Sequence, residues 1–163
     1  MNKETPHAYD AVETVLQQYG PMVYRLAFSH TGCRADADDV FQEVFLRYIR
    51  YRVDYIDEEH RKAWLIRTTI HCSRTLLASA WYRRTVALPT DIRTEMPEKS
   101  EVYYAVAALP AKYRTVVHLH YYEGLSVREI GELTGQKEST VKSLLFRART
   151  KLRDALKGDI ADV

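Results

Sequence analysis

One stretch near the carboxyl end combines the side chains that read duplex DNA. Residues 139–156 fit a helix with one apolar row, which is Val141, Leu145, Ala148, Leu152 and Leu156. The outward face gathers hydroxyl, cationic and aromatic groups, namely Ser139, Thr140, Lys142, Ser143, Phe146, Arg147, Thr150 and Arg153. Arginine and lysine bind guanine edges or phosphates, hydroxyls bind either, and an aromatic ring packs on a thymine methyl. This face therefore predicts a helix that enters a major groove.

The residues just before this helix supply the rest of a helix-turn-helix. Ser126 and Glu129 have the spacing of a capping box, and Gly135 follows as a left-handed stop. Ser139 is then expected to cap the second helix. A short helix, a tight turn with glycine and a longer basic helix are typical of a DNA-binding helix-turn-helix. The plainer interpretation is a two-helix packing unit with a solvated basic face, and an outward Phe146 weighs against it.

A second basic segment suits unstacked nucleic acid. Residues 61–82 predict a long helix with a buried side made of Leu65, Ile66, Ile70, Cys72, Leu76, Leu77 and Ala80. The opposite side presents Trp64, Arg67, Thr68, His71, Arg74 and Thr75. An aromatic ring among cations and hydroxyls binds single strands by base stacking and phosphate contacts. An alternative of equal weight is that Trp64 packs on a neighbouring helix and the arginines are merely solvated.

An acidic group earlier in the chain raises the question of metal-dependent catalysis. Asp36, Asp38, Asp39 and Glu43 could hold a divalent ion in a helical nuclease or transferase. However, Gln42 interrupts the DDxxD pattern and the chain has no second acidic motif. Acids at this place are better explained by the positive end of a helix, so we expect no metal, no cofactor and no catalysis.

Other features of the sequence exclude several classes of protein. His118 and His120 are two residues apart and point apart on a helix, so they cannot share a metal. Cys33 and Cys72 lie far from each other, which argues against a disulfide scaffold and fits a reducing cytosol. No apolar run approaches the length of about 18 residues that a membrane span needs. We expect a cytoplasmic protein without membrane insertion.

The net charge of +2 is close to neutral, but acidic and basic residues are concentrated in different segments of the chain. Residues 36–60 hold eight acidic and three basic residues, whereas residues 61–84 hold six basic residues and no acid. Residues 110–157 hold ten basic and five acidic residues. Two separate basic segments favour two contacts with a polyanion.

Helical periodicity dominates the chain and no hairpin signal interrupts it. Residues 11–29 predict a helix interrupted at Gly20–Pro21. Residues 37–50 predict another, with apolar rows formed by Val40, Val44 and Tyr48 and by Phe41, Phe45 and Ile49. Residues 101–109 and 111–122 predict two more, with Pro110 at a first turn.

The domain division follows from one aperiodic stretch, residues 85–100, which contains two prolines and mixed charge. We therefore expect an all-α chain of two small helical domains joined by a flexible linker. The expected boundaries are 1–86, 87–100 and 101–163.

In this order, the pieces resemble an RNA polymerase sigma factor of the extracytoplasmic-function (ECF) group of the sigma-70 family. Residues 38–47 (DDVFQEVFLR) are similar to the family's region 2.2, and residues 62–67 (KAWLIR) are similar to the opening of region 2.4. Residues 124–149 are similar to region 4.2. The resemblance covers roughly residues 8–157.

The resemblance implies a transcription initiation factor that binds core RNA polymerase and is not an enzyme. Its residues 37–51 would dock on the clamp helices of the largest subunit, through Asp38, Asp39, Gln42, Glu43, Leu46 and Arg47. Residues 52–75 would capture and help melt the −10 element. The linker would thread toward the RNA exit path. Residues 101–157 would hold the −35 duplex and the flap of the second-largest subunit, and an anti-sigma factor is a further candidate partner.

Two positions depart from the family pattern. The family usually has asparagine where this chain has His71, and commonly arginine where it has Leu144, beside the expected recognition face. Both departures bear on the promoter sequence rather than on the class of protein. The competing hypothesis is a free-standing helix-turn-helix regulator with an N-terminal sensing or dimerisation domain, which would bind an operator tightly without polymerase.

Overall fold

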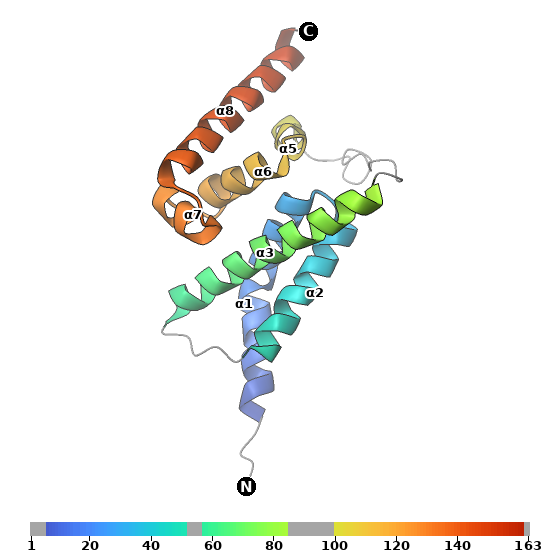
Figure 1. Cartoon of the computed structure of the whole chain (residues 1–163), viewed down its shortest axis with the longest axis vertical. Coiled ribbons are helices and arrows are strands. Elements are labelled where there is room, and N and C mark those ends of the chain that lie inside the picture. The colour runs from blue at the N-terminus through green and yellow to red at the C-terminus, as the bar shows by residue number, and fades with distance from the viewer. Residues whose placement is uncertain (1–5, 52–56, 85–99, 162–163) are drawn as a thin grey trace.

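Every regular element in the described part of the chain is a helix, as the sequence predicts. The computed structural model describes residues 6–51, 57–84 and 100–161. In chain order the elements are α1 (Pro6–Thr31), α2 (Arg34–Arg50), α3 (Glu58–Arg84), α5 (Glu101–Ala107), α6 (Ala111–Val117), the π-helix η1 (His118–Tyr122), α7 (Val127–Thr134) and α8 (Glu138–Ala161). Figure 1 shows α1, α2 and α3 packed on one another, with α5 to α8 gathered beside them. No described helix is both long and apolar enough to cross a membrane.

The first three helices close around an apolar core because each carries one buried stripe. Val23 and Leu26 of α1, Val44 of α2 and Leu65 of α3 are fully buried there. A hydrogen bond links the middle of α1 to the start of α3, where the Tyr19 hydroxyl donates to the Glu58 carboxylate at 2.7 Å. Burial and that bond together raise the pKa of Tyr19 to about 12.

The expected break at Gly20–Pro21 is wrong, because α1 runs unbroken through Pro21. The residue before a proline usually leaves the helical region when its Cβ clashes with the proline ring. Gly20 has no Cβ, so it remains helical. Pro21 is exposed, and it sacrifices a single backbone hydrogen bond on the solvent side.

Helix α2 begins at Arg34, three residues earlier than the sequence predicts, because Cys33 caps it. The backbone N–H of Asp36 donates to the Cys33 sulfur at 3.4 Å. Asp36 lies in the first turn, where a carboxylate interacts favourably with the helix dipole. Asp36 therefore has a structural explanation, whereas Asp38 and Asp39 lie beyond the first turn.

Helices α5 and α6 meet at Pro110, which is the N-cap of α6. Ser100 caps α5 by accepting a 3.2 Å hydrogen bond from the backbone of Tyr103. Helix α6 then widens into η1 instead of continuing as one helix to residue 122. The expected linker, residues 87–100, lies outside the described residues except for Ser100.

The helix-turn-helix has the local structure that its sequence predicts. Ser126 and Glu129 form a reciprocal capping box, with hydrogen bonds of 3.1 and 3.0 Å. Gly135 ends α7 in the left-handed region at φ 69°, where glycine has no steric penalty. The expected cap at Ser139 is wrong: α8 already begins at Glu138, so Ser139 lies inside its first turn.

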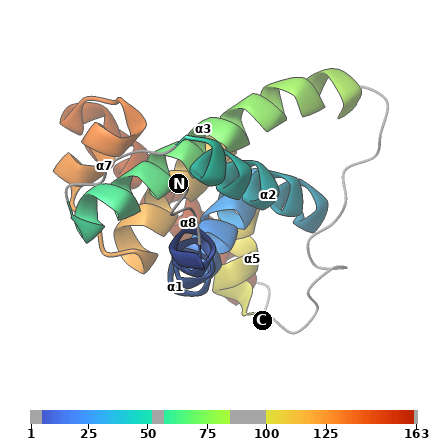
Figure 2. The same cartoon turned by 90° about the horizontal axis from the view of Figure 1, so that it is seen from below.

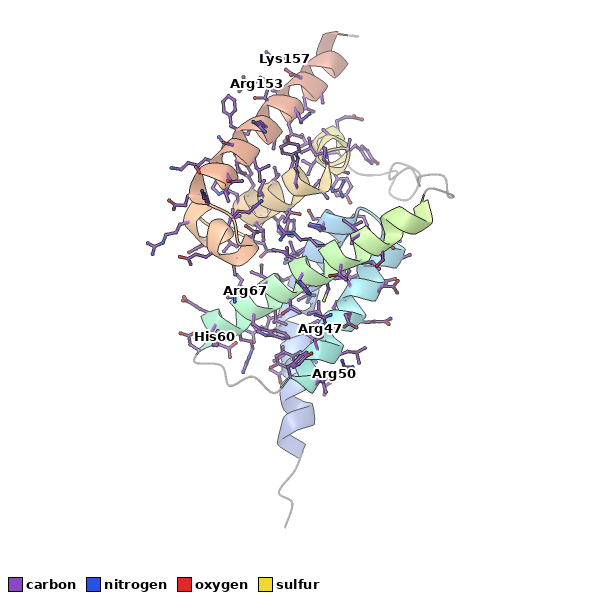
Figure 3. The ribbon with its side chains drawn as sticks, viewed as in Figure 1. Arg47, Arg50, His60, Arg67, Arg153 and Lys157 are labelled. Atoms are coloured by element: carbon purple, nitrogen blue, oxygen red, sulfur yellow. The ribbon has the colours of Figure 1, made fainter. Side chains whose placement is uncertain are left out.

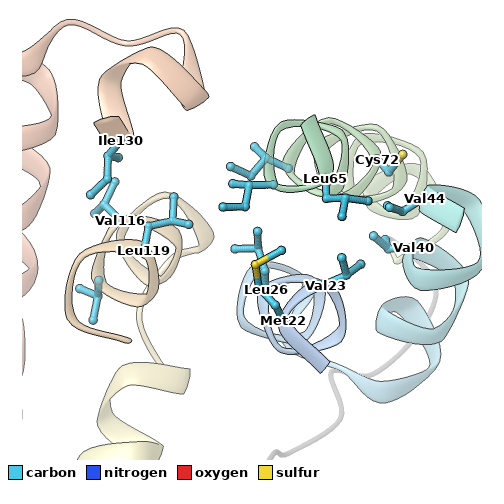
Figure 4. Close-up of a cluster of buried hydrophobic side chains, with 14 of the residues drawn as sticks. Met22, Val23, Leu26, Val40, Val44, Leu65, Cys72, Val116, Leu119 and Ile130 are labelled. Atoms are coloured by element: carbon cyan, nitrogen blue, oxygen red, sulfur yellow. The ribbon is translucent and has the colours of Figure 1, made fainter. Parts of the chain in front are cut away.

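The two groups of helices also contact each other. Helix α1 packs against α6, and α3 packs against α7. Figure 4 shows Val116, Leu119 and Ile130 of the second group lying across from Leu26 and Leu65 of the first, and these side chains belong to one continuous buried cluster. Figure 2 shows the same arrangement from below, with α7 beside the first half of α3.

Candidate nucleic-acid interface

Helix α8 presents the outward face that the sequence predicts. All eight residues expected at the −35 element are exposed: Ser139, Thr140, Lys142, Ser143, Phe146, Arg147, Thr150 and Arg153. Phe146 is 68 % exposed, which is unusual for so large an apolar ring. Val141, Leu145 and Ala148 on the opposite side are at most 1 % exposed. Figure 3 shows Arg153 and Lys157 on the distal half of the helix, so the cationic face extends well beyond the turn.

The surface around Phe146 is hollowed. Phe146 lines a shallow depression with Val127, Lys142, Ser143 and Arg147. One expected hydroxyl is partly engaged, because Thr150 donates to the Phe146 carbonyl at 3.1 Å. A cationic rim around an exposed ring supplies both phosphate contacts and an apolar contact for a base.

Leu144 does not lie beside this face. It is 7 % exposed and belongs to the buried cluster. The family's arginine at this position is therefore replaced here by a core leucine, which stabilises packing and adds no contact to a groove.

On the second expected surface, which belongs to α3, the residues differ in how far they are exposed. Arg67, His71, Arg74 and Thr75 are exposed, and Thr68 is half-buried. The helix has a broader buried side than its apolar residues indicate, because Thr69 and Ser73 are also fully buried. Thr69 satisfies its hydroxyl by donating to the Leu65 carbonyl at 2.6 Å. Sequence periodicity missed both residues because they are polar.

Trp64 lies at the edge of this surface and not at its centre. It is half-buried, and its ring meets that of Tyr48 edge-on at 5.9 Å between centroids. The neighbouring-helix packing considered for Trp64 is thus present, while part of the ring stays accessible.

Helix α2 carries the residues expected at a protein partner. Asp38, Asp39 and Gln42 are exposed on one side, while Glu43 and Arg47 pair at 2.8 Å. Leu46 is 54 % exposed. Arg47 and Arg50 mark the distal part of this helix in Figure 3.

One apolar prediction on α2 is wrong, and it exposes a missed feature. Ile49 was expected in a buried row but is 54 % exposed, and Tyr51 just after the helix is 53 % exposed. Leu46 and Ile49, three residues apart and so on one side of the helix, form an exposed apolar stripe, called the α2 stripe below. The signal in the sequence is that three large apolar residues fall outside the rows occupied by Val40 and Val44.

Neither the acids nor the histidines assemble a metal centre in the part of the chain that the structure describes. No group of three or more His, Cys, Asp or Glu side chains there could hold a metal ion. Asp38 and Asp39 are exposed, Asp38 is hydrogen-bonded to Tyr24, and Glu43 pairs with Arg47.

Two family models match the chain at the regions with these surfaces. Residues 15–83 match Sigma-70 region 2, and residues 99–152 match Sigma-70 region 4. The chain is 33% identical over 157 residues to the ECF RNA polymerase sigma factor SigE of Mycolicibacterium smegmatis, a match covering 88% of this chain and 61% of that protein. It is 30% identical over 156 residues to the ECF sigma factor SigL of Mycobacterium tuberculosis, with coverage of 87% and 86%.

Solved structures share this fold. The fold matches CnrH, solved in complex with the cytosolic domain of CnrY, at a TM-score of 0.69 and 25% identity over 93% of this chain and 90% of that one. It also matches the fold of the sigma factor RpoE of Bartonella quintana, solved with the anti-sigma factor NepR, at a TM-score of 0.66 and 18% identity over 89% and 96% of the two chains. From the two matched regions and these relatives, the chain belongs to the ECF group of the sigma-70 family of RNA polymerase sigma factors.

Proposed function

We propose that this protein is a transcription initiation factor that binds core RNA polymerase and directs it to promoters with specific −10 and −35 elements. The observation that carries the proposal is the outward face of α8. Phe146, 68 % exposed, stands there among lysine and arginine side chains, on a helix whose other side is core. A helix of this kind has the form of a major-groove reader.

The proposed division of labour follows the two groups of helices. Residues 1–86 form the region 2 domain, which binds polymerase and the −10 element. Residues 87–100 form the linker, and residues 101–163 form the region 4 domain, which binds the −35 element. Support comes from the matched family regions, the first of which ends at residue 83 and the second of which begins at residue 99, near the two ends of the linker.

In the region 2 domain, α2 is the proposed contact for the clamp helices of the largest polymerase subunit. Its exposed acids suit a basic partner helix, and the α2 stripe gives the contact an apolar centre. Interfaces of this kind combine a desolvated apolar core with a charged rim. The exposed side of α3, with Arg67 and His71, is the proposed contact for the opened −10 strand.

In the region 4 domain, the proposal adds a contact with the flap of the second-largest subunit. A cytoplasmic site of action follows from these partners. An anti-sigma factor is a further proposed partner, since a protein of the same fold was solved with one. Run-off transcription with core polymerase and genomic DNA tests the function, because promoter-specific transcripts require polymerase and a free-standing regulator would instead bind its operator alone.

Substitutions on the outward face of α8 are expected to affect sequence specificity and overall DNA affinity separately. Arg147→Ala should cost roughly 1–3 kcal/mol at one base position and relax the preference there, as loss of a base contact does. Arg153→Ala, farther along the helix, should weaken all promoters alike and reduce the salt slope by about 1, as loss of a phosphate contact does. Phe146→Ala should reduce the preference for a thymine without changing the salt slope, because the side chain carries no charge.

The assay for these three variants is transcription by reconstituted holoenzyme over a library of −35 sequences at two salt concentrations. Lys112→Ala is the matched control, because Lys112 is an exposed cation on α6 that is not among the residues expected to contact DNA. If Phe146→Ala and Arg147→Ala both leave the preferred −35 sequence and the transcript level unchanged, α8 does not face the groove.

Docking on polymerase is tested separately on α2. The double variant Asp39→Arg with Gln42→Ala should weaken association with core polymerase by roughly tenfold or more, since like charges across an interface cost several kcal/mol. Both side chains are exposed, so stability should change by about 0.5 kcal/mol or less. Glu13→Arg, at an exposed acid of α1, is the control reversal. Core binding by the double variant at the level of the control contradicts the docking assignment.

A further inference from the structure

A cavity of about 590 Å³ lies where α1, in the first unit of helices (α1 to α3), meets α5, α6 and η1 of the second unit (α5 to α8). Small-molecule sites in proteins have volumes of about 300–1,000 Å³. The residues that line this cavity belong neither to the expected DNA surfaces of α3 and α8 nor to the α2 stripe. The cavity is therefore separate from the surfaces that the proposed function uses.

The walls of the cavity are mainly aromatic. Tyr24 and Phe28 line it from α1, Tyr103 lines it from α5, and Tyr121 and Tyr122 line it from η1. None of these five side chains is fully buried, so their rings offer apolar surface to an occupant. Aromatic rings pack favourably on other rings, either stacked with an offset or edge to face. The walls therefore favour an occupant that has rings of its own.

The π-helix η1 positions one part of this wall. The His118 and Tyr122 rings stack at 5.1 Å between centroids, with 15° between their planes. The Arg25 guanidinium lies 5.0 Å from the centre of the same Tyr122 ring. Short π-helical segments are rare and frequently occur at functional sites. Two contacts thus hold Tyr122 in place beside the cavity.

The charge at the cavity is positive. Arg25 and Arg114 both line it, whereas no aspartate or glutamate among the described residues does. The Glu123 carboxylate lies 3.7 Å from the Arg25 guanidinium, but its side chain is 8 % exposed and is not part of the lining. Water screens a charge beside an apolar cavity only weakly, so the two arginines favour an anionic occupant.

The two arginines differ in what they can offer to an anion. Arg114 donates hydrogen bonds to the carbonyls of Ser29 at 2.8 Å and His30 at 2.7 Å, so it contributes charge to the cavity and directs donors to the protein. The contact of Arg25 with Glu123, at 3.7 Å, is longer than a hydrogen bond. The N–H groups of Arg25 are thus able to donate to an anion, and a guanidinium suits carboxylate, sulfonate and phosphate groups.

We propose that this cavity is a binding site for an aromatic organic anion, whose rings lie against the aromatic walls and whose acidic group is bound by Arg25. The chemical class comprises linked or fused rings that carry one carboxylate, sulfonate or phosphate group. The inference goes beyond the proposed function, whose partners are all macromolecules, and it does not rest on that function.

Fluorescence titration of the full chain with anilinonaphthalene sulfonate tests this site. The dye carries linked aromatic rings and one sulfonate, and its emission increases in an apolar environment. Phenylnaphthylamine has the same rings without the sulfonate, so it is the matched uncharged probe. Wild type is expected to bind the sulfonate dye saturably.

Two variants test the acidic group and the cavity separately. Arg25→Met should weaken binding of the sulfonate dye by about tenfold or more and leave phenylnaphthylamine binding nearly unchanged, because only the first probe loses a charge-assisted hydrogen bond. Arg34→Met, at an exposed arginine of α2 outside the lining, is its control. Ala107→Trp should fill the cavity from α5 and abolish binding of both probes. Ala108→Trp, at the exposed neighbour outside the lining, is the second control.

Circular dichroism shows whether Ala107→Trp folds, and if it does not, Arg25→Met decides. The proposal is overturned if wild type shows no saturable binding, or if Arg25→Met binds the sulfonate dye as wild type does. Equal weakening of both probes by Arg25→Met also overturns it, because the cavity would then suit apolar side chains of a protein partner and not an anion. Binding of the dye to a folded Ala107→Trp, or its loss in a folded Ala108→Trp, rules out this cavity as the site.

Discussion

Leu65→Ala should destabilise the chain by about 2–5 kcal/mol, whereas Leu46→Ala should leave its stability nearly unchanged. The two substitutions delete the same atoms from helices of the same unit. Leu65 is fully buried between α1, α2 and α3, so its truncation leaves a cavity and loses apolar contacts. Leu46 is 54 % exposed, so water replaces what is removed.

Two measurements on these variants, one of stability and one of polymerase binding, distinguish an effect on folding from an effect on function. Chemical denaturation should place the Leu65→Ala midpoint well below that of wild type and of Leu46→Ala. Association with core polymerase should be weakened specifically by Leu46→Ala, because its side chain belongs to the α2 stripe. If Leu46→Ala binds core polymerase like wild type, the stripe is not part of the docking surface. If Leu65→Ala is as stable as wild type, the core has been wrongly located.

The difference in burial between these two leucines shows what sequence periodicity can and cannot predict. A repeat of 3.6 residues correctly placed Val40 and Val44 in the core, and Leu65 and Ile70 as well. It misplaced Ile49, which is 54 % exposed although Phe45, one turn earlier in the same row, is buried. Periodicity reports which residues share a face, but burial depends on whether another element lies against that face.

Motifs whose interacting residues lie within a few positions of each other predicted the local structure more reliably than periodicity predicted burial. The capping box at Ser126 and the left-handed Gly135 were predicted correctly because their partners lie three or four positions away. Cys33 as a cap was missed, since sulfur is a weak acceptor and cysteine is an uncommon choice at that position. The contact between the two units was not predictable, because it joins residues 85 positions apart, such as Ser29 and Arg114.

Burial at this boundary should also make the protein lose stability in mild acid, through His30. Its side chain lies between helices of the two units and is 5 % exposed. Burial, which has the largest effect, and the nearby cations Arg74 of α3 and Arg114 of α6 together lower the pKa of His30 from 6.5 to about 4. Its hydrogen-bond partner Thr115 donates its own proton to the Ala111 carbonyl at 2.9 Å. The imidazole Nδ1–H is therefore the donor to Thr115, and the neutral ring satisfies this site.

The direction in which stability changes with pH depends on whether the folded or the unfolded chain binds the proton more readily. In the unfolded chain His30 protonates near pH 6.5, whereas in the native chain it resists protonation until about pH 4. Stability is therefore complete above pH 6.5 and falls as the pH drops from 6.5 toward 4. At 1.36 kcal/mol for each unit of pKa difference, the loss by pH 4 is about 3 kcal/mol.

The matched variant is His30→Asn, whose amide can donate in place of Nδ1–H but does not titrate. Carboxylates such as Glu123 also lose favourable interactions in acid, but they do so in both proteins, so the difference between the two isolates His30. Denaturation of both proteins between pH 7.5 and 4 should show wild type losing about 3 kcal/mol more than the variant. Parallel stability curves would mean that His30 reaches solvent in the native chain.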